Sequence, residues 1–145
     1  MKARGAGARA VSFLAATFLQ AVVLFITAWG GFRLWAAWHG AAWLRTLPLE
    51  VPWLYLVVSG AAWLVAGLTT WLMLLTGHRW AAAATAATVT LFGAFWWLDR
   101  FALTRNAVFR YDERFAVALT ATVVLAVLAL TTPPIWNSLF GANDE

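Results

Sequence analysis

The chain has 145 residues, of which 63% are hydrophobic and 11% are charged, with a formal net charge of +4. Soluble domains average about 45 to 50% apolar and about 25% charged residues. A domain this small still exposes much of its surface, so the composition excludes an ordinary soluble protein. The absence of cysteine excludes disulfides, thiolate metal sites and thiol redox chemistry.

The first apolar run follows a basic tail that contains Lys2, Arg4 and Arg9. Residues 11–32 carry no charge, and about 20 apolar residues cross the hydrocarbon core of a bilayer. We therefore predict a transmembrane helix over residues 11–34. A basic tail before an apolar run is also typical of a secretory signal, but signal cores have only about 7 to 15 residues, so we expect this helix to be retained.

Two regions follow the first helix. The segment Arg33 to Glu50 mixes three tryptophans with Arg33, His39 and Arg45, which is the composition of a stretch at the membrane surface. We expect this segment to lie along the interface. A second charge-free run begins beside Pro52, which a first helical turn tolerates, so residues 51–76 are predicted as the second transmembrane helix.

The second half of the chain contains two more predicted spans. The short link Gly77-His78-Arg79 forces the next helix back beside the previous one, and we place the third helix at residues 79–99. The fourth is predicted over residues 114–132, where Pro133 and Pro134 stop it. The expected fold is all-α: a single transmembrane domain, residues 1–145, built as a four-helix bundle with an interfacial segment after the first helix.

Nine of the eleven tryptophans fall near predicted helix ends, as in the aromatic belts at membrane interfaces. They are Trp29, Trp35, Trp38, Trp43, Trp53, Trp80, Trp96, Trp97 and Trp136. The basic residues also lie at segment ends, which favours lipid headgroups over nucleic acid as their partner. The N-terminal tail and second loop carry four Lys and Arg residues and the first and third loops carry six, a count that favours cytoplasmic first and third loops, whereas the first helix, which often sets the orientation, favours a cytoplasmic N-terminus. We expect both termini to be cytoplasmic, in the cell inner (plasma) membrane.

Neutral polar residues occupy the predicted spans, and no ionisable residue lies near the middle of any of them. Thr17, Gln20, Leu24 and Thr27 share one helical face, which we expect to point toward the bundle. Thr17 and Gln20 form the candidate intramembrane polar contact. Gln20 either contacts a substrate or another subunit, or makes a hydrogen bond within the chain, which is the ordinary case.

Small residues form stripes on two predicted helices, and small side chains let membrane helices approach closely. One stripe is Ser59, Ala62 and Ala66, and the other is Ala118, Thr122, Ala126 and Ala129. These stripes predict packing rather than activity.

Several mechanisms lack the residues that they need. Proton-coupled exchange of cations requires a carboxylate inside the membrane, and none lies near the middle of a predicted span. Proteolysis inside the membrane requires a nucleophile with a base, and Ser59 has no histidine at its depth to act as that base. His39 and His78 are predicted on opposite sides of the membrane, which disfavours them as haem or chlorophyll ligands. We expect no catalytic residue, no metal site and no cofactor.

One concentration of polar residues remains. Arg33 and Asp99 each end an apolar run, and the first and third helices run in the same direction, so the two side chains are expected at the same membrane face, where they can pair. Glu50 and Arg100 complete this candidate polar cap. It is either a docking surface or headgroup site, or an ordinary set of paired and snorkelling charges.

The residues Pro52-Trp53-Leu54-Tyr55, Gly77-His78-Arg79-Trp80-Ala81 and Trp97-Leu98-Asp99-Arg100 resemble those of small four-helix bacterial membrane proteins that have no assigned activity. The resemblance implies topology only. We expect a non-enzymatic accessory, assembly or structural subunit whose partners are the lipid bilayer and other membrane proteins or copies of itself. The alternative is a small homo-oligomeric transporter or lipid-handling protein.

Overall fold

The computed structural model describes residues 2–40, 53–103 and 113–140, and for residues 2–6, 8 and 9 only the course of the backbone. These residues form five α-helices and no strand. Four of the helices are long and apolar enough to cross a membrane: α1, α3, α4 and α5. The all-helical prediction with four such helices is thereby confirmed.

Helix α1 spans Lys2–His39 and is longer than predicted. Its 38 residues extend about 57 Å, well beyond the about 30 Å of a hydrocarbon core. The helix does not end at Arg33 because nothing from Arg33 to His39 interrupts the backbone, and it stops before Gly40. The expected interfacial segment therefore begins as a continuation of α1, and its remainder lies outside the described residues.

Helix α3 spans Trp53–Leu75 and α4 spans Ala81–Leu103. The link between them begins with Gly77, whose φ of 62° is the left-handed conformation that glycine adopts readily. The amide of His78 donates to the carbonyl of Met73 at 2.9 Å and that of Gly77 to Leu74 at 3.4 Å, which is a Schellman cap. The predicted hairpin turn at Gly77 is confirmed, whereas α4 continues past Asp99.

Helix α5 spans Glu113–Thr131 and the short helix α6 spans Pro133–Phe140. The two prolines were predicted only to end the fourth helix. Proline is also favoured in the first turn of a helix, where its missing amide costs nothing, and α6 begins at Pro133 for that reason. Trp136 and Phe140 of α6 then pack against the hydrophobic core.

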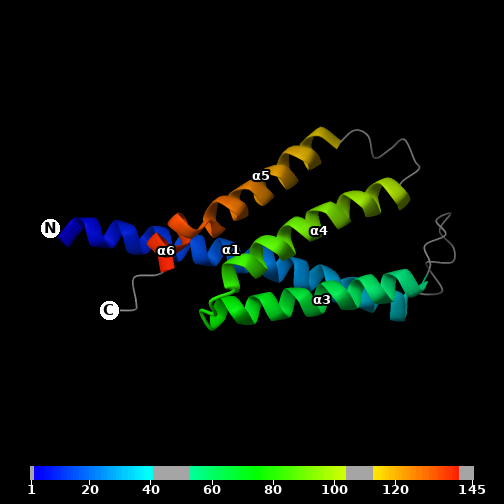
Figure 1. The fold of residues 1–145 in the computed structure, drawn as a ribbon. Helices are drawn as coiled ribbons and strands as arrows, with labels where there is room; N and C mark the ends of the chain where they lie inside the picture. The colour runs from blue at the N-terminus through cyan, green and yellow to red at the C-terminus, as the bar shows by residue number, and fades with distance from the viewer. Residues whose placement is uncertain (1, 41–52, 104–112, 141–145) are drawn as a thin grey trace.

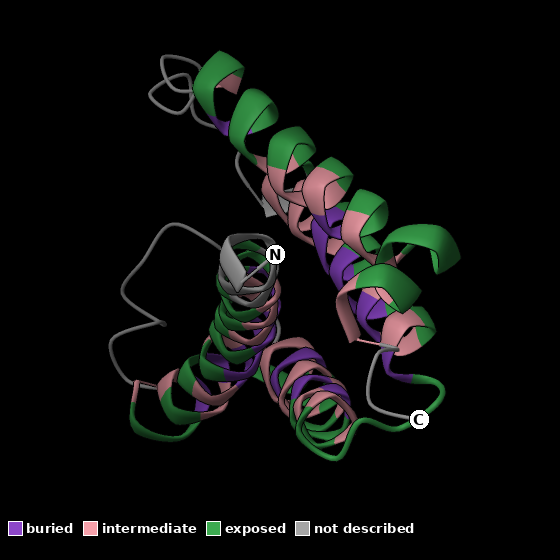
Figure 2. Cartoon of the chain, turned by 90° about the vertical axis from the view of Figure 1, so that its left-hand side faces the viewer, coloured by how far each residue is buried: buried purple, intermediate pink, exposed green. Residues whose placement is uncertain are grey.

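The four long helices alternate in direction along the chain, so that the N-terminal end of α1 and the helix α6 lie at the same end of the molecule (Figure 1). The core is formed by Leu19, Ile26, Val89, Phe92 and Val127. Buried residues follow the sides of the helices that face one another, while the outer sides are exposed (Figure 2). A membrane-spanning bundle shows this distribution because lipid covers its outside.

The pair α1 and α3 is the most closely packed part of the bundle. A Cβ atom at Gly30 would lie 2.8 Å from the carbonyl oxygen of Gly60, and one at Gly67 would lie 3.1 Å from Cα of Thr27. These glycines let the two backbones approach each other, as small residues do between membrane helices. Of the predicted stripe on this helix, Ser59 is buried but Ala62 is exposed, because Gly60 and Gly67 form the contact instead.

Candidate functional site: a buried ion pair and an apolar cleft

Three helices meet at a buried ion pair. Arg33 of α1 donates from Nη1 to Oδ2 of Asp99 of α4 at 2.6 Å. Tyr55 of α3 donates its hydroxyl to the other carboxylate oxygen, Oδ1, at 2.7 Å. The side chains of Arg33 and Asp99 are 7% and 13% exposed, so the charges are largely removed from solvent. Each carboxylate oxygen of Asp99 has a partner.

Local packing explains why Arg33 points inward. It follows Ile26 and Gly30 on the buried face of α1 and precedes Ala37. A Cβ atom added at Gly60 would lie only 3.1 Å from the Cβ of Arg33, so the glycine leaves space for the arginine against α3. A charge in such surroundings is tolerated when it is paired.

Aromatic rings enclose the guanidinium of Arg33. Its Cζ atom lies 5.3 Å from the ring centroid of Tyr55 and 5.4 Å from that of Phe95, which are cation–π distances. Its Nε and Nη2 atoms are buried without a hydrogen-bond partner in the described part of the chain. The rings therefore cover the part of the cation that the carboxylate does not reach. The ion pair has no net charge and links α1, α3 and α4.

The structure divides the predicted polar cap into two places. Arg33 and Asp99 pair, as the direction of their helices predicted. Arg33 does so within the apolar stretch Ala10–His39 rather than at its end. Arg100 belongs to a different environment, and Glu50 lies outside the described residues. Tyr55 is not among the predicted site residues. Its hydroxyl group, at the same predicted membrane face as Asp99, is the signal that identifies it.

The predicted intramembrane contact is not formed as expected. Thr17 is exposed and donates to the carbonyl of Phe13 in its own helix at 2.9 Å, and Leu24 is 41% exposed. Thr27 is buried but also bonds its own helix, at Val23. The face that turns inward is the apolar one with Leu19 and Ile26, which are 0% and 1% exposed.

Gln20 is half-buried beside a small pocket of about 130 Å³ between α1, the α3–α4 turn and α6. Trp136 and Phe140 of α6 line the opposite wall. This pocket exists because α6 packs against α1. Helix α6 is not among the predicted helices. Thr17 does not line it, so the structure separates the two members of the candidate contact.

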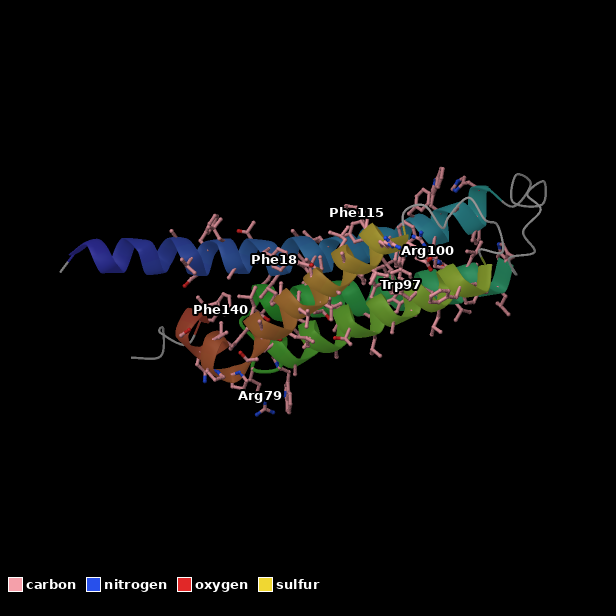
Figure 3. All side chains as sticks on the ribbon, turned by 90° about the horizontal axis from the view of Figure 1, so that it is seen from above. Phe18, Arg79, Trp97, Arg100, Phe115 and Phe140 are labelled. Atoms are coloured by element: carbon pink, nitrogen blue, oxygen red, sulfur yellow. The ribbon has the colours of Figure 1, made fainter. Side chains whose placement is uncertain are left out.

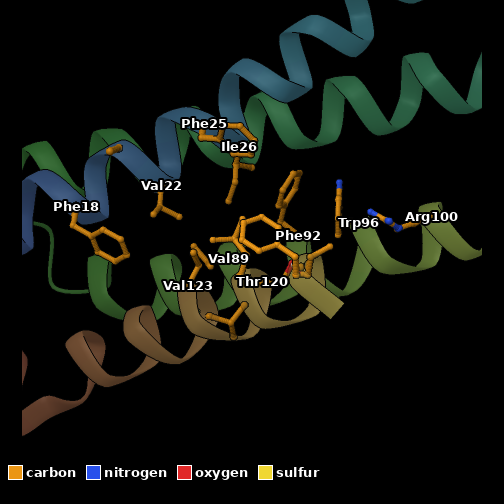
Figure 4. A pocket seen from close by; sticks show the side chains of 16 residues that line it. Phe18, Val22, Phe25, Ile26, Val89, Phe92, Trp96, Arg100, Thr120 and Val123 are labelled. Carbon is orange, nitrogen blue, oxygen red and sulfur yellow. The ribbon is translucent and has the colours of Figure 1, made fainter. Parts of the chain in front are cut away.

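A larger apolar cleft lies between α1, α4 and α5, with a volume of about 590 Å³ (Figure 4). Phe18 and Arg100 lie at opposite ends of it in the close-up. Sixteen residues line the cleft: Phe18, Ala21, Val22, Phe25, Ile26, Val89, Phe92, Gly93, Trp96, Arg100, Phe115, Ala116, Leu119, Thr120, Val123 and Val124. Thr120 bonds the carbonyl of Ala116 at 2.8 Å, so Arg100 supplies the one charged group of the lining.

Arg100 is positioned by the aromatic residues of its own helix. Its Cζ atom lies 5.3 Å from the ring centroid of Trp96 and 5.6 Å from that of Trp97. Figure 3 places Arg100, Trp97 and Phe115 toward one end of the bundle and Arg79 and Phe140 toward the other. Nothing in the sequence pattern indicated the cleft, because residues of three helices form it rather than those of any single helix.

Neither histidine takes part in these sites. His39, at the end of α1, has Nδ1 3.3 Å from the carbonyl oxygen of Trp35, and Nδ1 of His78 accepts from the amide of Trp80. His39 ends α1 and His78 lies in the turn between α3 and α4, and these two parts of the chain lie at opposite ends of the bundle (Figure 1). In residues 2–40, 53–103 and 113–140, no three His, Cys, Asp or Glu residues are grouped as a metal site.

No family model, curated protein or solved structure matches this chain. The resemblance to small four-helix bacterial membrane proteins therefore stays a prediction.

Proposed function

We propose that the chain is a non-enzymatic integral membrane protein that acts as an accessory or assembly subunit, by packing the outer face of α5 against a helix of a membrane partner. The observation that carries this proposal is the incomplete packing of α5. Only 6% of its most apolar stretch is buried, compared with 28% for α1 and for α4. Helix α5 packs on α4 and α6 and makes little contact with the rest of the bundle.

Insertion into a membrane is supported by the surface of the molecule. Large apolar side chains are exposed on every long helix, including Phe13, Val65, Leu91 and Phe115 at 71%, 63%, 63% and 71%. A soluble monomer seldom exposes so much contiguous apolar surface. Exposed tryptophans lie at both ends of the bundle, where interfacial aromatic residues anchor membrane helices.

The outer face of α5 has the chemistry of a helix-packing surface. Ala118, Thr122 and Ala129 of the predicted small-residue stripe are exposed, and Ala126 is half-buried. Thr122 donates to the carbonyl of Ala118 in its own helix at 2.7 Å, which leaves a face with little polar demand. Because hydrophobicity does not drive helix association in lipid, such faces associate through close contact. The stripe that the sequence predicted for packing is thus available to another helix.

A non-catalytic role agrees with the state of the buried hydroxyl groups. Ser59 donates to the carbonyl of Tyr55 at 2.6 Å, and the hydroxyl oxygens of Thr70 and Thr88 lie 2.9 Å apart. Thr85 bonds the carbonyl of Ala81 at 2.8 Å. Ser59 and Thr85 are thus bonded to their own helices, and Thr70 and Thr88 join α3 to α4.

The proposed location is the cell inner (plasma) membrane with both termini cytoplasmic. The start of α1 and α6 lie at the same end of the molecule (Figure 1), as four crossings require. A reporter fused at residue 145 that works only in the cytoplasm should be active. Activity of a reporter that works only outside the cytoplasm would overturn this orientation.

Native mass spectrometry of the protein, extracted from its own membrane in mild detergent, tests the partner role. We expect a foreign membrane subunit to accompany the wild-type chain and to be lost from Ala118→Phe, which blocks close approach. Ala83→Phe, on an exposed position of α4, is the matched control and should retain the subunit. A lone monomer from the native membrane would contradict the proposal, and a pure homo-oligomer would assign the α5 face to self-association instead.

The structure restricts the alternative function, a small homo-oligomeric transporter. A path through Thr17 and Gln20 within one chain has no support, because Thr17 is exposed, so a homo-oligomeric transporter would have to place these residues between copies. Flux that falls in Gln20→Leu and Thr17→Val vesicles would favour it. Lipid handling has separate support in the cleft between α1, α4 and α5.

A further inference from the structure

The cleft between α1, α4 and α5 has an end that differs from the rest. Its walls are aromatic and aliphatic side chains, and Arg100 lies at one end while Phe18 lies at the other (Figure 4). An apolar channel with one cation at its mouth matches a molecule that has an apolar chain and an anionic head. We propose that this cleft binds an acyl chain of a phospholipid from the surrounding bilayer, whose anionic headgroup is held by Arg100.

The length of the cleft matches one leaflet. From Val89 to Arg100, both of which line it, α4 rises about 16 Å. Half of a hydrocarbon core is about 15 Å. A lipid whose headgroup is at the depth of Arg100 therefore has its chain alongside Phe92 and Val89, where the lining is apolar.

Arg100 has the right position and chemistry for a headgroup. It lies near the end of α4, beside Trp96 and Trp97, which stack on its guanidinium. Indoles and arginines gather at headgroup depth. The guanidinium is a planar fork of N–H donors that suits phosphate, and the two indole rings lie beside it.

The size of the cleft distinguishes a lipid chain from a partner helix. Its volume of about 590 Å³ lies within the roughly 300 to 1,000 Å³ of small-molecule sites. A membrane-spanning helix about 10 Å wide and 30 Å long occupies roughly 2,400 Å³. The cleft is therefore too small for a helix, and the partner face of α5, which carries Ala118 and Thr122, is not part of its lining.

The test uses the full chain reconstituted in vesicles of equal parts phosphatidylcholine and phosphatidylglycerol, then extracted in mild detergent for native mass spectrometry. We expect one retained lipid per chain, enriched in phosphatidylglycerol. Ala21→Trp and Val123→Trp fill the cleft from opposite walls and should each lower retention about tenfold. Ala28→Trp and Val117→Trp place the same bulk on exposed positions outside the cleft and should retain the lipid.

The headgroup contact is tested separately. Arg100→Gln should keep an acyl chain in the cleft but lose the preference for phosphatidylglycerol about tenfold. Arg79→Gln is the matched control, because Arg79 also stacks on a tryptophan, Trp80, at 5.7 Å, but outside the cleft. Equal retention in Ala21→Trp, Val123→Trp and their controls would overturn the site, and an unchanged preference in Arg100→Gln would overturn the role of Arg100.

Discussion

The α1–α3 pair and the α4–α5 pair are both antiparallel and apolar, yet they pack differently. Gly30, Gly60 and Gly67 bring α1 and α3 into backbone contact, and the indole of Trp53 donates to the carbonyl of Ala37 at 2.9 Å between them. Helix α5 instead leans on α4 and leaves the cleft beside α1. Gly93 of α4 meets only side-chain atoms of α5, with Val124 Cγ2 at 3.4 Å and Thr120 Cγ2 at 3.6 Å from an added Cβ, whereas Gly30 and Gly60 meet backbone atoms of the opposite helix.

This difference assigns separate roles to the two halves. The α1–α3 half, locked to α4 through Arg33, Tyr55 and Asp99, is the scaffold. The α5 side offers both the apolar cleft and an exposed small-residue face. Variants that weaken the scaffold should therefore lower stability, while variants on the exposed face of α5 should change binding and leave the fold intact.

The largest expected effect comes from the ion pair. Asp99→Asn leaves the charge of Arg33 buried without a counter-ion, and we expect it to lower the free energy of unfolding by about 3 to 5 kcal/mol. Reversible unfolding in mixed micelles measures this loss. The double variant Arg33→Met with Asp99→Leu removes both charges and should recover most of the stability. An Asp99→Asn protein as stable as the wild type would show that the ion pair does not stabilise the bundle.

The glycine contact gives the next effect and has a control one residue away. Gly30→Ala places a methyl group against the backbone of α3, and overpacking of this kind costs about 1 to 3 kcal/mol. At Gly31 the nearest atom to an added Cβ is a side-chain carbon of Leu64 at 3.8 Å. Gly31→Ala should therefore be neutral or slightly stabilising. Equal effects in the same unfolding assay would show that α1 and α3 are not in backbone contact.

The smallest effect is expected at Tyr55. Tyr55→Phe keeps the ring over Arg33 and removes only the hydrogen bond to Asp99. A bond to a charged group contributes about 1.5 to 3 kcal/mol, and because the ion pair remains we expect the lower end of that range. A double-mutant cycle with Asp99→Asn separates the bond from the ring, since the two changes should be strongly non-additive. Additive losses would mean that Tyr55 acts through packing alone.

Much of the architecture followed from the apolar runs. Their length fixed the four helices, Gly77 fixed the turn, and the shared direction of the first and third helices brought Arg33 to Asp99. The end of α1 was misplaced because charge and tryptophan mark depth in a membrane, whereas a helix ends where the backbone is interrupted. Helix α6 was not predicted because a proline that ends one helix can also begin the next, as Pro133 does.

The inward face of α1 and the cleft were beyond the sequence for a different reason. Lipid and protein interior are both apolar, so a pattern of polar residues such as Thr17 and Thr27 does not say which side packs. Leu19 is fully buried and Leu24 is 41% exposed, although the two side chains are chemically identical. The cleft is lined by residues of three helices, and the pattern of one helix does not reveal how it packs on the other two.

Cross-linking in the native membrane tests the separation of scaffold and binding side most directly. The chain has no cysteine, so a photo-reactive group can be attached to a single cysteine introduced by substitution. We predict that Thr122→Cys on α5 yields a defined protein adduct, while Ala62→Cys, exposed on α3, labels lipid alone. Protein adducts of equal yield at both positions, or lipid labelling alone at both, would contradict the assignment of the α5 face to a partner.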